Sequence, residues 1–387
     1  MNNNIEKAFS NGYYGRKLRK EYKTRRDWKY YLKRGEKAFE KGLFEESYEY
    51  LSKSIEERMP PYQYNSRAYF LRAIINYDWE LLTDAEYDLT KAISRQPCPG
   101  FYEFYLRGII FLRLNKLRDA IKDFKKSISL NPNHFESYFN KGSCNYDIGN
   151  YFSAIRDFDN AFKINKNDKD LFINRGLAYF QLANYKNAII DFDKVKNLSP
   201  FSFDIFFYSG QSKSRLRDYI NAKEEFSYII NSINNSENSS QYDELLCSSY
   251  LEKAWSNSRI GMANESIEDL KKSLNFSCKG VLFYKHLIIS GYTYSKLNKY
   301  SDSIRFYDQA ENYIQKEGFS GTQKAFLLML RGIVLAKSEY YENALEDIEK
   351  MFKFDKKILE KDEEKVFDEM PEYMKNIIRI SLNISLS

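Results

Sequence analysis

The chain has 387 residues, 43% of them apolar, and carries a formal charge of +6 at pH 7. Its most apolar run, AFLLMLRGIVLA at residues 325–336, is too short to cross a bilayer and contains Arg331, which excludes a membrane-spanning helix there. Glycine and proline are sparse, at 16 and 7 residues, as expected for long helices joined by short turns.

The basic charge is concentrated at the N-terminus. Residues 1–41 hold 13 Lys and Arg against 5 Asp and Glu, which leaves 47 against 49 for the rest of the chain. Within residues 1–27, cationic and aromatic side chains are interleaved, a pattern that can contact phosphates and stack on bases. We favour a solvated tail or helical cap for this segment and keep nucleic-acid binding as the second hypothesis.

The four cysteines, Cys98, Cys144, Cys247 and Cys278, lie far apart in the sequence. They form no CxxC pair and no zinc spacing, so we expect reduced thiols, no metal and no cofactor. The first residues, MNNNIEKAFSNGYYGRK, lack the apolar core of a secretory signal. These features predict a cytoplasmic protein that is not in a membrane.

Residues 101–134 carry a spacing that organises most of the chain. Counting Phe101 as position 1, the residues at positions 4, 8, 11, 20, 24, 27 and 32 are Phe104, Gly108, Phe111, Ala120, Phe124, Ser127 and Pro132. Small residues at 8 and 20 let two antiparallel helices cross closely, and the aromatic residues fill the space beside the crossing. This spacing resembles the tetratricopeptide repeat, a helical hairpin that buries its apolar face by stacking on further copies.

The same pattern returns about nine times along the chain. The repeats begin near Trp28, Ser66, Phe101, Phe135, Lys169, Phe203, Cys247 and Tyr284, and the ninth is marked by Leu328 and Gly332. Gly108, Gly142, Gly176 and Gly210 are each 34 residues apart. The resemblance implies an all-α fold, a right-handed superhelical solenoid of about nine helix-turn-helix repeats with terminal capping helices.

The expected organisation has five parts. Residues 1–27 form the basic N-terminal segment or cap, 28–236 repeats one to six, 237–246 a polar insertion, 247–358 repeats seven to nine, and 359–387 the C-terminal capping helices. A solenoid needs a cover for its last apolar face. We expect that cover to come from Phe367, Tyr373, Ile377, Ile378 and Ile380.

Six repeats carry a cation at position 7 and an acid at position 23. The pairs are Arg72 with Asp88, Arg107 with Asp123, Lys141 with Asp157, Arg175 with Asp191, Lys253 with Asp269, and Arg331 with Asp347. We predict that each pair bridges the two helices of its repeat, because six copies of one pair suit a structural role better than a catalytic one. Repeats one and six keep one member, Arg34 and Glu225, and repeat eight, with Ser290 and Phe306, keeps neither.

The resemblance also implies a binding surface, because positions 2, 5, 9, 12 and 13 of the first helix line the concave groove in this family. In repeats two to six, these positions and two asparagines at position 6 give the candidate peptide-binding residues Phe70, Ile74, Tyr77, Tyr105, Ile109, Leu112, Phe139, Asn140, Tyr146, Ile173, Asn174, Phe180 and Phe207. An apolar strip with charges along its rim suits a helical or extended segment of a partner protein.

Two alternatives to an open groove remain. Either the position 5 side chains form part of the core wall, or the basic N-terminal segment or the C-terminal helix fills the groove. The clamp with which some family members hold acidic chaperone tails is absent, because it needs lysine at position 5, which is apolar throughout this chain.

The sequence offers little for catalysis. It contains two histidines, His134 and His286, and neither a GxxxxGK[ST] nor an HExxH motif. We therefore predict a non-catalytic protein–protein interaction scaffold or adaptor that binds a partner's peptide in the groove. The alternative is a nucleic-acid-associated regulatory protein that uses residues 7–41 for phosphates, and salt-sensitive binding that is lost without residues 1–27 would distinguish it.

Overall fold

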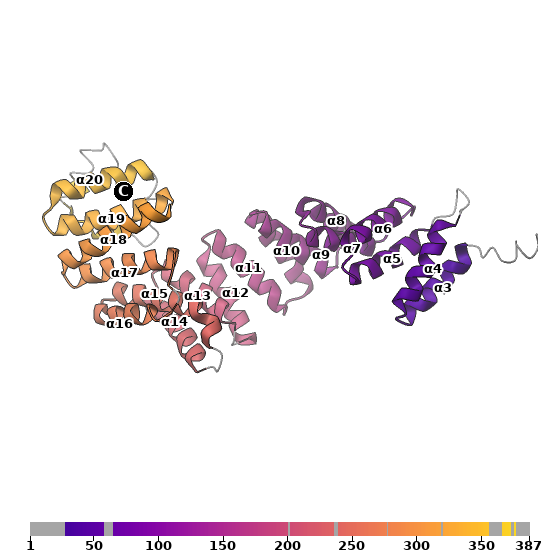
Figure 1. The fold of residues 1–387 in the computed structure, drawn as a ribbon, viewed down its shortest axis with the longest axis horizontal. Coiled ribbons are helices and arrows are strands. Elements are labelled where there is room, and N and C mark those ends of the chain that lie inside the picture. The colour runs from indigo at the N-terminus through magenta and orange to yellow at the C-terminus, as the bar shows by residue number, and fades with distance from the viewer. Residues whose placement is uncertain are drawn as a thin grey trace, which may run out of the picture. The chain divides into compact units, whose positions relative to one another are not determined.

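A computed structural model gives the fold of the chain (Figure 1). It describes residues 28–57, 65–199, 202–235, 239–276, 278–318, 320–355, 366–372 and 375–376. The basic segment 1–27 lies outside the described residues, as do the expected capping residues Tyr373, Ile377, Ile378 and Ile380 and the side chain of Phe367. The chain divides into two compact units, residues 1–171 and 172–387, called unit 1 and unit 2 below.

The helices of unit 1 follow one another as antiparallel pairs. They are α3 (Trp28–Glu40), α4 (Phe44–Glu56), α5 (Ser66–Asp78), α6 (Leu82–Ser94), α7 (Phe101–Arg113), α8 (Leu117–Leu130), α9 (Phe135–Asp147) and α10 (Tyr151–Ile164). α11 (Lys169–Gln181) begins at the end of unit 1 and continues into unit 2.

Unit 2 continues the same arrangement. Its further α-helices are α12 (Tyr185–Leu198), α13 (Phe203–Arg215), α14 (Tyr219–Asn234), α15 (Asp243–Arg259), α16 (Ala263–Ser273), α17 (Val281–Lys296), α18 (Tyr300–Glu317), α19 (Gly321–Lys337) and α20 (Tyr341–Phe354). Two short 3-10 helices are η1 (Ser239–Tyr242) and η3 (Val366–Glu369). α15 thus begins at Asp243, inside the stretch 237–246 that we expected to be an insertion.

The all-α prediction is confirmed. The part of the chain that the structure describes forms 18 α-helices in consecutive pairs and no strand. Among these described helices, none combines the length and the apolar character needed to cross a bilayer.

One turn joins the two helices of every described pair. The residue at position 15 has a positive φ each time: Gly42, Glu80, Asn115, Gly149, Ala183, Arg217, Gly261, Asn298 and Glu339. The N–H of the next residue donates to the carbonyl of position 11, as from Leu81 to Asn76 at 2.8 Å and from Lys116 to Phe111 at 2.8 Å. This is the Schellman ending of a helix, in which a left-handed residue lets the chain reverse while the last carbonyls stay bonded. The backbone of position 15 therefore sets where each second helix begins.

The two helices of a pair cross where position 8 meets position 24. A methyl group added at Gly108 would lie 2.7 Å from Cε1 of Phe124. Gly142, Gly176 and Gly210 stand in the same relation to Phe158, Phe192 and Phe226. Where position 8 is alanine, as in Ala73 and Ala254, position 24 is the smaller leucine, Leu89 or Leu270. In these four repeats, glycine at position 8 thus provides room for the aromatic ring of its partner helix, whereas Gly35 and Gly332 face Leu51 and Ile348.

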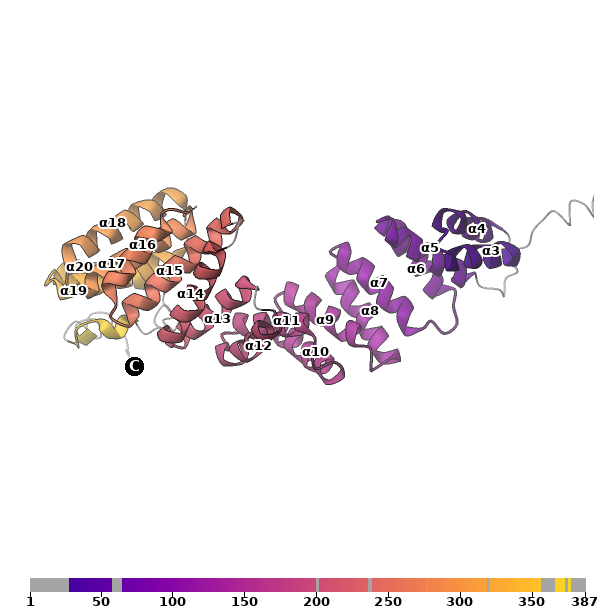
Figure 2. The same ribbon diagram turned by 90° about the horizontal axis from the view of Figure 1, so that it is seen from below.

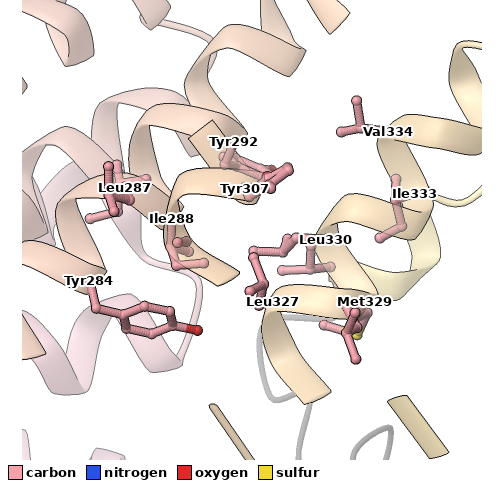
Figure 3. Close-up of a cluster of buried hydrophobic side chains, with 14 of the residues drawn as sticks. Tyr284, Leu287, Ile288, Tyr292, Tyr307, Leu327, Met329, Leu330, Ile333 and Val334 are labelled. Atoms are coloured by element: carbon pink, nitrogen blue, oxygen red, sulfur yellow. The ribbon is translucent and has the colours of Figure 1, made fainter. Parts of the chain in front are cut away.

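The largest buried cluster lies in unit 2 and joins α17 to α19. Tyr284, Leu287, Ile288 and Tyr292 come from α17, and Leu327, Met329, Leu330 and Ile333 come from α19 (Figure 3). Val366 and Met370, at and just after η3, belong to the same cluster and are 1% and 2% exposed. The segment around η3 is therefore packed into the core of the last repeats.

The expectation that all cysteines are reduced thiols is wrong for two of them. Cys247 on α15 and Cys278, in the connection before α17, form a disulfide with Cα atoms 6.0 Å apart. They are 31 residues apart in sequence, close to one repeat length, and stacking brings the start of one repeat beside the connection into the next. Cys98 is free and exposed, and Cys144 is free and buried, which raises the pKa of its thiol to about 12.

Candidate functional site

The candidate groove residues of unit 1 lie on α5, α7 and α9, the first helices of three successive pairs (Figure 2). They are Phe70, Ile74 and Tyr77 on α5, Tyr105, Ile109 and Leu112 on α7, and Phe139, Asn140 and Tyr146 on α9. All nine side chains are half-buried, and those on α5 and α7 pack against buried clusters of unit 1.

Position 5 differs between the early and the late repeats. In repeats seven, eight and nine it holds Leu251, Ile288 and Met329, which are 0%, 4% and 0% exposed. Phe70 and Tyr105, by contrast, are half-buried. The core-wall alternative therefore describes the late repeats, whereas the same position in α5 and α7 is partly accessible.

Tyr105 is the centre of an aromatic strip in unit 1. Its ring lies 4.7 Å from the His134 ring in an edge arrangement and 5.8 Å from Tyr102, and Tyr102 lies 6.2 Å from Phe70. Burial and the charge of Glu136 raise the pKa of Tyr105, and burial lowers the pKa of His134. Both shifts favour the neutral side chain, and the Glu136 carboxylate lies 3.2 Å from Nε2 of His134 at the edge of the strip.

Asn140 bonds within its own helix. Its Nδ2 donates to the Glu136 carbonyl at 2.8 Å. A peptide backbone would have to compete for that donor, so the use of Asn140 as a peptide ligand stays a prediction.

Four candidate groove residues belong to unit 2. Ile173, Asn174 and Phe180 lie on α11 and Phe207 lies on α13, and all four are half-buried. The Phe180 ring is 5.3 Å from Tyr208. The Phe207 ring is 5.7 Å from Phe226, the residue that faces the helix crossing of its pair. Phe207 thus packs against the buried cluster of α14, and Phe180 packs against a neighbouring ring of α13.

The structure places each position 7 cation beside the position 23 acid of the same pair. The shortest distances are 2.8 Å for Arg72–Asp88, 2.6 Å for Arg107–Asp123, 2.5 Å for Lys141–Asp157, 2.8 Å for Arg175–Asp191, 2.9 Å for Lys253–Asp269 and 2.7 Å for Arg331–Asp347. The arginines place Nε and Nη2 on the two carboxylate oxygens. All six aspartates are buried, so these ion pairs lie inside each helix pair and are not part of a surface that a ligand could contact.

Two stretches of the chain match models of a known family. Residues 101–134 and 170–202 each match a model described as tetratricopeptide repeat. They coincide with the pairs α7–α8 and α11–α12, whose crossings and ion pairs have the geometry given above. The chain is a tetratricopeptide repeat protein.

Known proteins resemble parts of this tetratricopeptide chain. Protein SGT1 homolog from Bos taurus is 38% identical over 64 residues, or 16% of this chain, and the chain spans 19% of that relative. The C-terminal part of a TPR repeat-containing protein from Cytophaga hutchinsonii has a TM-score of 0.53 at 18% identity, over 66% of this chain and 98% of that one. YrrB, described as a TPR protein with an unusual peptide-binding site, has a TM-score of 0.44 at 19% identity, over 51% of this chain and 97% of that one.

Sequence reasoning missed an asparagine that completes some of the tetratricopeptide ion pairs. At position 11, Asn145 donates to Oδ2 of Asp157 at 2.8 Å, and Asn257 donates to Oδ2 of Asp269 at 2.8 Å. In both repeats the cation is lysine, which bonds Oδ1 alone. Asn76 makes the same contact with Asp88 at 3.0 Å. The signal was present in the sequence as an asparagine 12 residues before each of these aspartates.

Two repeats that lack the full pair keep a contact between the same positions. In repeat six, Glu225 at position 23 is contacted by Lys213 at position 11 and, at 2.5 Å, by Lys196 of α12. In repeat eight, Tyr294 at position 11 lies 5.3 Å from Phe306 at position 23, ring to ring. Both repeats therefore keep a link between their two helices. It is ionic in repeat six and aromatic in repeat eight.

Proposed function

We propose that the chain is a non-catalytic scaffold or adaptor that binds a peptide segment of a partner protein on the α5, α7 and α9 face of unit 1. Tetratricopeptide repeat proteins generally mediate protein–protein interactions. The observation that carries the proposal is the aromatic strip that runs from Phe70 through the exposed Tyr102 to Tyr105 and His134.

The strip has the chemistry that a groove-bound peptide needs. Apolar anchors fit aromatic rings that are held from one side, and charges at the rim fix the register of the peptide. Arg113 provides one such charge: its guanidinium lies 5.5 Å from the Tyr77 ring centre and 3.0 Å from Glu80. In unit 2 we propose Ile173, Asn174, Phe180 and Phe207 as an equivalent surface.

A matched pair of variants tests the proposal. Tyr105→Glu/Phe139→Glu places two carboxylates on the proposed surface. Tyr87→Glu/Phe152→Glu makes the same change on α6 and α10, at rings that are 55% and 76% exposed. Partners captured from nuclease-treated lysate and then titrated as pure proteins should bind wild type and the second variant and lose at least tenfold in affinity for the first.

Equal binding by both variants would reject this surface. Because Tyr105 and Phe139 are half-buried, circular dichroism must first show that the variant melts like wild type. Tyr102→Glu is the milder alternative, because this ring is 45% exposed and lies in the same strip.

A cytoplasmic location is part of the proposal. The Cys247–Cys278 disulfide stands against it, because reducing compartments keep thiols free. Acid quenching of cells followed by alkylation and mass spectrometry would decide: free thiols at both positions support the cytoplasm, and a disulfide at full occupancy contradicts it.

A further inference from the structure

Glu369, the last residue of η3, is held by side chains from three different repeats of unit 2. Its Oε1 receives hydrogen bonds from Arg259 Nη1 at 3.0 Å and from the Tyr292 hydroxyl at 2.5 Å. Its Oε2 lies 2.8 Å from Lys296 Nζ and 3.7 Å from Lys337 Nζ. One carboxylate thus meets three cations and a hydroxyl.

The three cations form a row because of the repeat. Arg259, Lys296 and Lys337 are the last residues of α15, α17 and α19, and each occupies position 13 of its repeat. α17 packs against both α15 and α19, so equivalent positions fall side by side. A cation is also favoured at a helix C-terminus, where the backbone carbonyls carry partial negative charge.

The charges of the row act on the pKa values of Glu369 and Lys337. Burial alone would raise its pKa, but hydrogen bonds from Lys296 and Tyr292 and the nearby lysine charges outweigh burial and hold the pKa below its usual value. Burial and the charge of Lys296 lower the pKa of Lys337, although the charge of Glu369 acts to raise it. The row therefore favours an ionised carboxylate at this place.

The other contacts of the segment around Glu369 are apolar. Val366, three residues before Glu369, and Met370, one residue after it, are 1% and 2% exposed in the cluster shared by α17 and α19. Asp355 directly follows α20, and the ten residues KKILEKDEEK separate Asp355 from Val366 in the sequence. A segment that belongs to the same chain as its site has a high effective concentration there, so it can stay bound even when its own affinity is low.

We propose that the row of Arg259, Lys296 and Lys337 is a binding site for an acidic segment of a partner protein, and that the segment around Glu369 occupies it until the partner displaces it. The partner's segment needs an acidic residue with an apolar residue three positions before it and another directly after it. This site lies in repeats seven to nine and is separate from the surface proposed above for unit 1.

A labelled peptide with the sequence EEKVFDEMPEY, residues 363–373, tests exchange on the full-length chain. Glu369→Gln in the chain weakens the internal contact and leaves the cation row intact. If the segment around Glu369 occupies the site in more than nine-tenths of wild-type molecules, its release should tighten binding of the labelled peptide at least tenfold. Asp368→Asn, at an exposed neighbouring carboxylate, is the matched control and should bind as wild type does.

Two results would overturn the proposal. One is equal or no peptide binding by wild type and Glu369→Gln. The other is undiminished binding when Lys296→Glu is added to Glu369→Gln or when the peptide carries glutamine at the position of Glu369, because affinity would then not depend on the charge contact.

A second measurement keeps the test valid if Glu369→Gln unfolds. Wild-type chain is mixed with excess peptide that carries norleucine in place of methionine, and hydrogen exchange is followed over residues 366–372. Faster exchange with the peptide than without it supports displacement. Unchanged exchange at saturating peptide shows a fixed structural cap and rejects the proposal.

Discussion

Arg175 holds the Asp191 carboxylate with two parallel hydrogen bonds, from Nε to Oδ2 and from Nη2 to Oδ1, each 2.8 Å long. The two residues are 7% and 2% exposed, so their charges are largely removed from water. In such a pair, loss of one partner leaves the other charge uncompensated, whereas loss of both removes the desolvation cost as well.

Arg175→Leu should therefore destabilise the protein by about 3 kcal/mol, because it removes both hydrogen bonds to the buried Asp191 carboxylate and leaves the more distant Lys194, at 3.8 Å, as its cation. The double variant Arg175→Leu/Asp191→Leu should recover much of that loss, since no buried charge remains. Urea unfolding of the two single variants and the double variant closes a mutant cycle. If the double variant loses the sum of the two singles, the residues are not coupled and the pair has no bridging role.

Gly108→Ala should destabilise the pair α7–α8 by about 1–3 kcal/mol through overpacking, although alanine is the better helix former by about 1 kcal/mol. The added methyl would lie 2.7 Å from the Phe124 ring, which must then move. Phe124→Leu in the same chain should relieve the clash and reproduce the combination seen at Ala73 and Leu89. A gain in melting temperature from Gly108→Ala alone would show that the crossing is looser than described.

Ala183→Gly should stabilise the protein by about 0.5–1 kcal/mol. Ala183 has φ +55° in the turn between α11 and α12, a conformation that glycine adopts without the steric cost that a Cβ imposes. Ala188→Gly is the opposite control, because Ala188 is buried in α12 with helical backbone, and this change should cost about 1 kcal/mol or more. The prediction fails if both variants shift the unfolding midpoint downward.

His286 should make stability depend on pH between about 6.5 and 4. Its ring is 7% exposed, stacks on Phe283 and lies 3.2 Å from the Ser273 hydroxyl, and burial lowers its pKa to about 4. The native state therefore keeps the ring neutral while the unfolded chain takes up a proton near pH 6.5. The stabilisation is complete above that pH and is lost as pH falls toward 4, by up to about 3 kcal/mol.

His286→Gln should flatten this dependence, measured as the urea midpoint at pH 7.5, 6.0 and 5.0. His134→Gln is the comparison, because the pKa of His134 is also lowered by burial but its ring is less enclosed. Glu252 and Glu369 also have lowered pKa values, so their contributions are lost only below the usual range of glutamate. An unchanged slope in His286→Gln between pH 7.5 and 5.0 would contradict the assignment.

The helix pairs could be predicted from sequence because side-chain size is fixed where two helices cross. Gly108 and Phe124 stand at positions where few other residues fit, and the same restriction recurs in later repeats, so a fixed spacing is visible along the chain. The cation at position 7 and the acid at position 23 were visible for a similar reason: a buried carboxylate requires a partner at one definite place.

Other features of the structure could not be predicted from a sequence pattern. The left-handed residue at position 15 is set by the backbone, and Glu80, Ala183, Arg217 and Asn298 share no side-chain property that a pattern would show. Leu251 and Phe70 are both apolar residues at position 5, yet one is buried and the other half-buried, because burial depends on what packs beside each helix. The contact of Glu369 with Arg259 spans 110 residues and lies outside the repeat register altogether.

The sixteen-residue spacing of the position 7 and position 23 charges, as in Arg72 and Asp88, also bears on how such a chain can change length. Both members of a pair lie within one repeat, so a duplication or deletion of a 34-residue unit carries the two charges together and leaves neither stranded. Glu225 is different, because Lys196 reaches it from the preceding repeat. A gene rearrangement that cut between repeats five and six would take that cation away and leave Glu225 with Lys213 of its own repeat. The ion pairs that cross the boundary between repeats two and three, Arg113–Glu80 and Lys116–Glu86, are more exposed, so we expect a cut there to cost less stability.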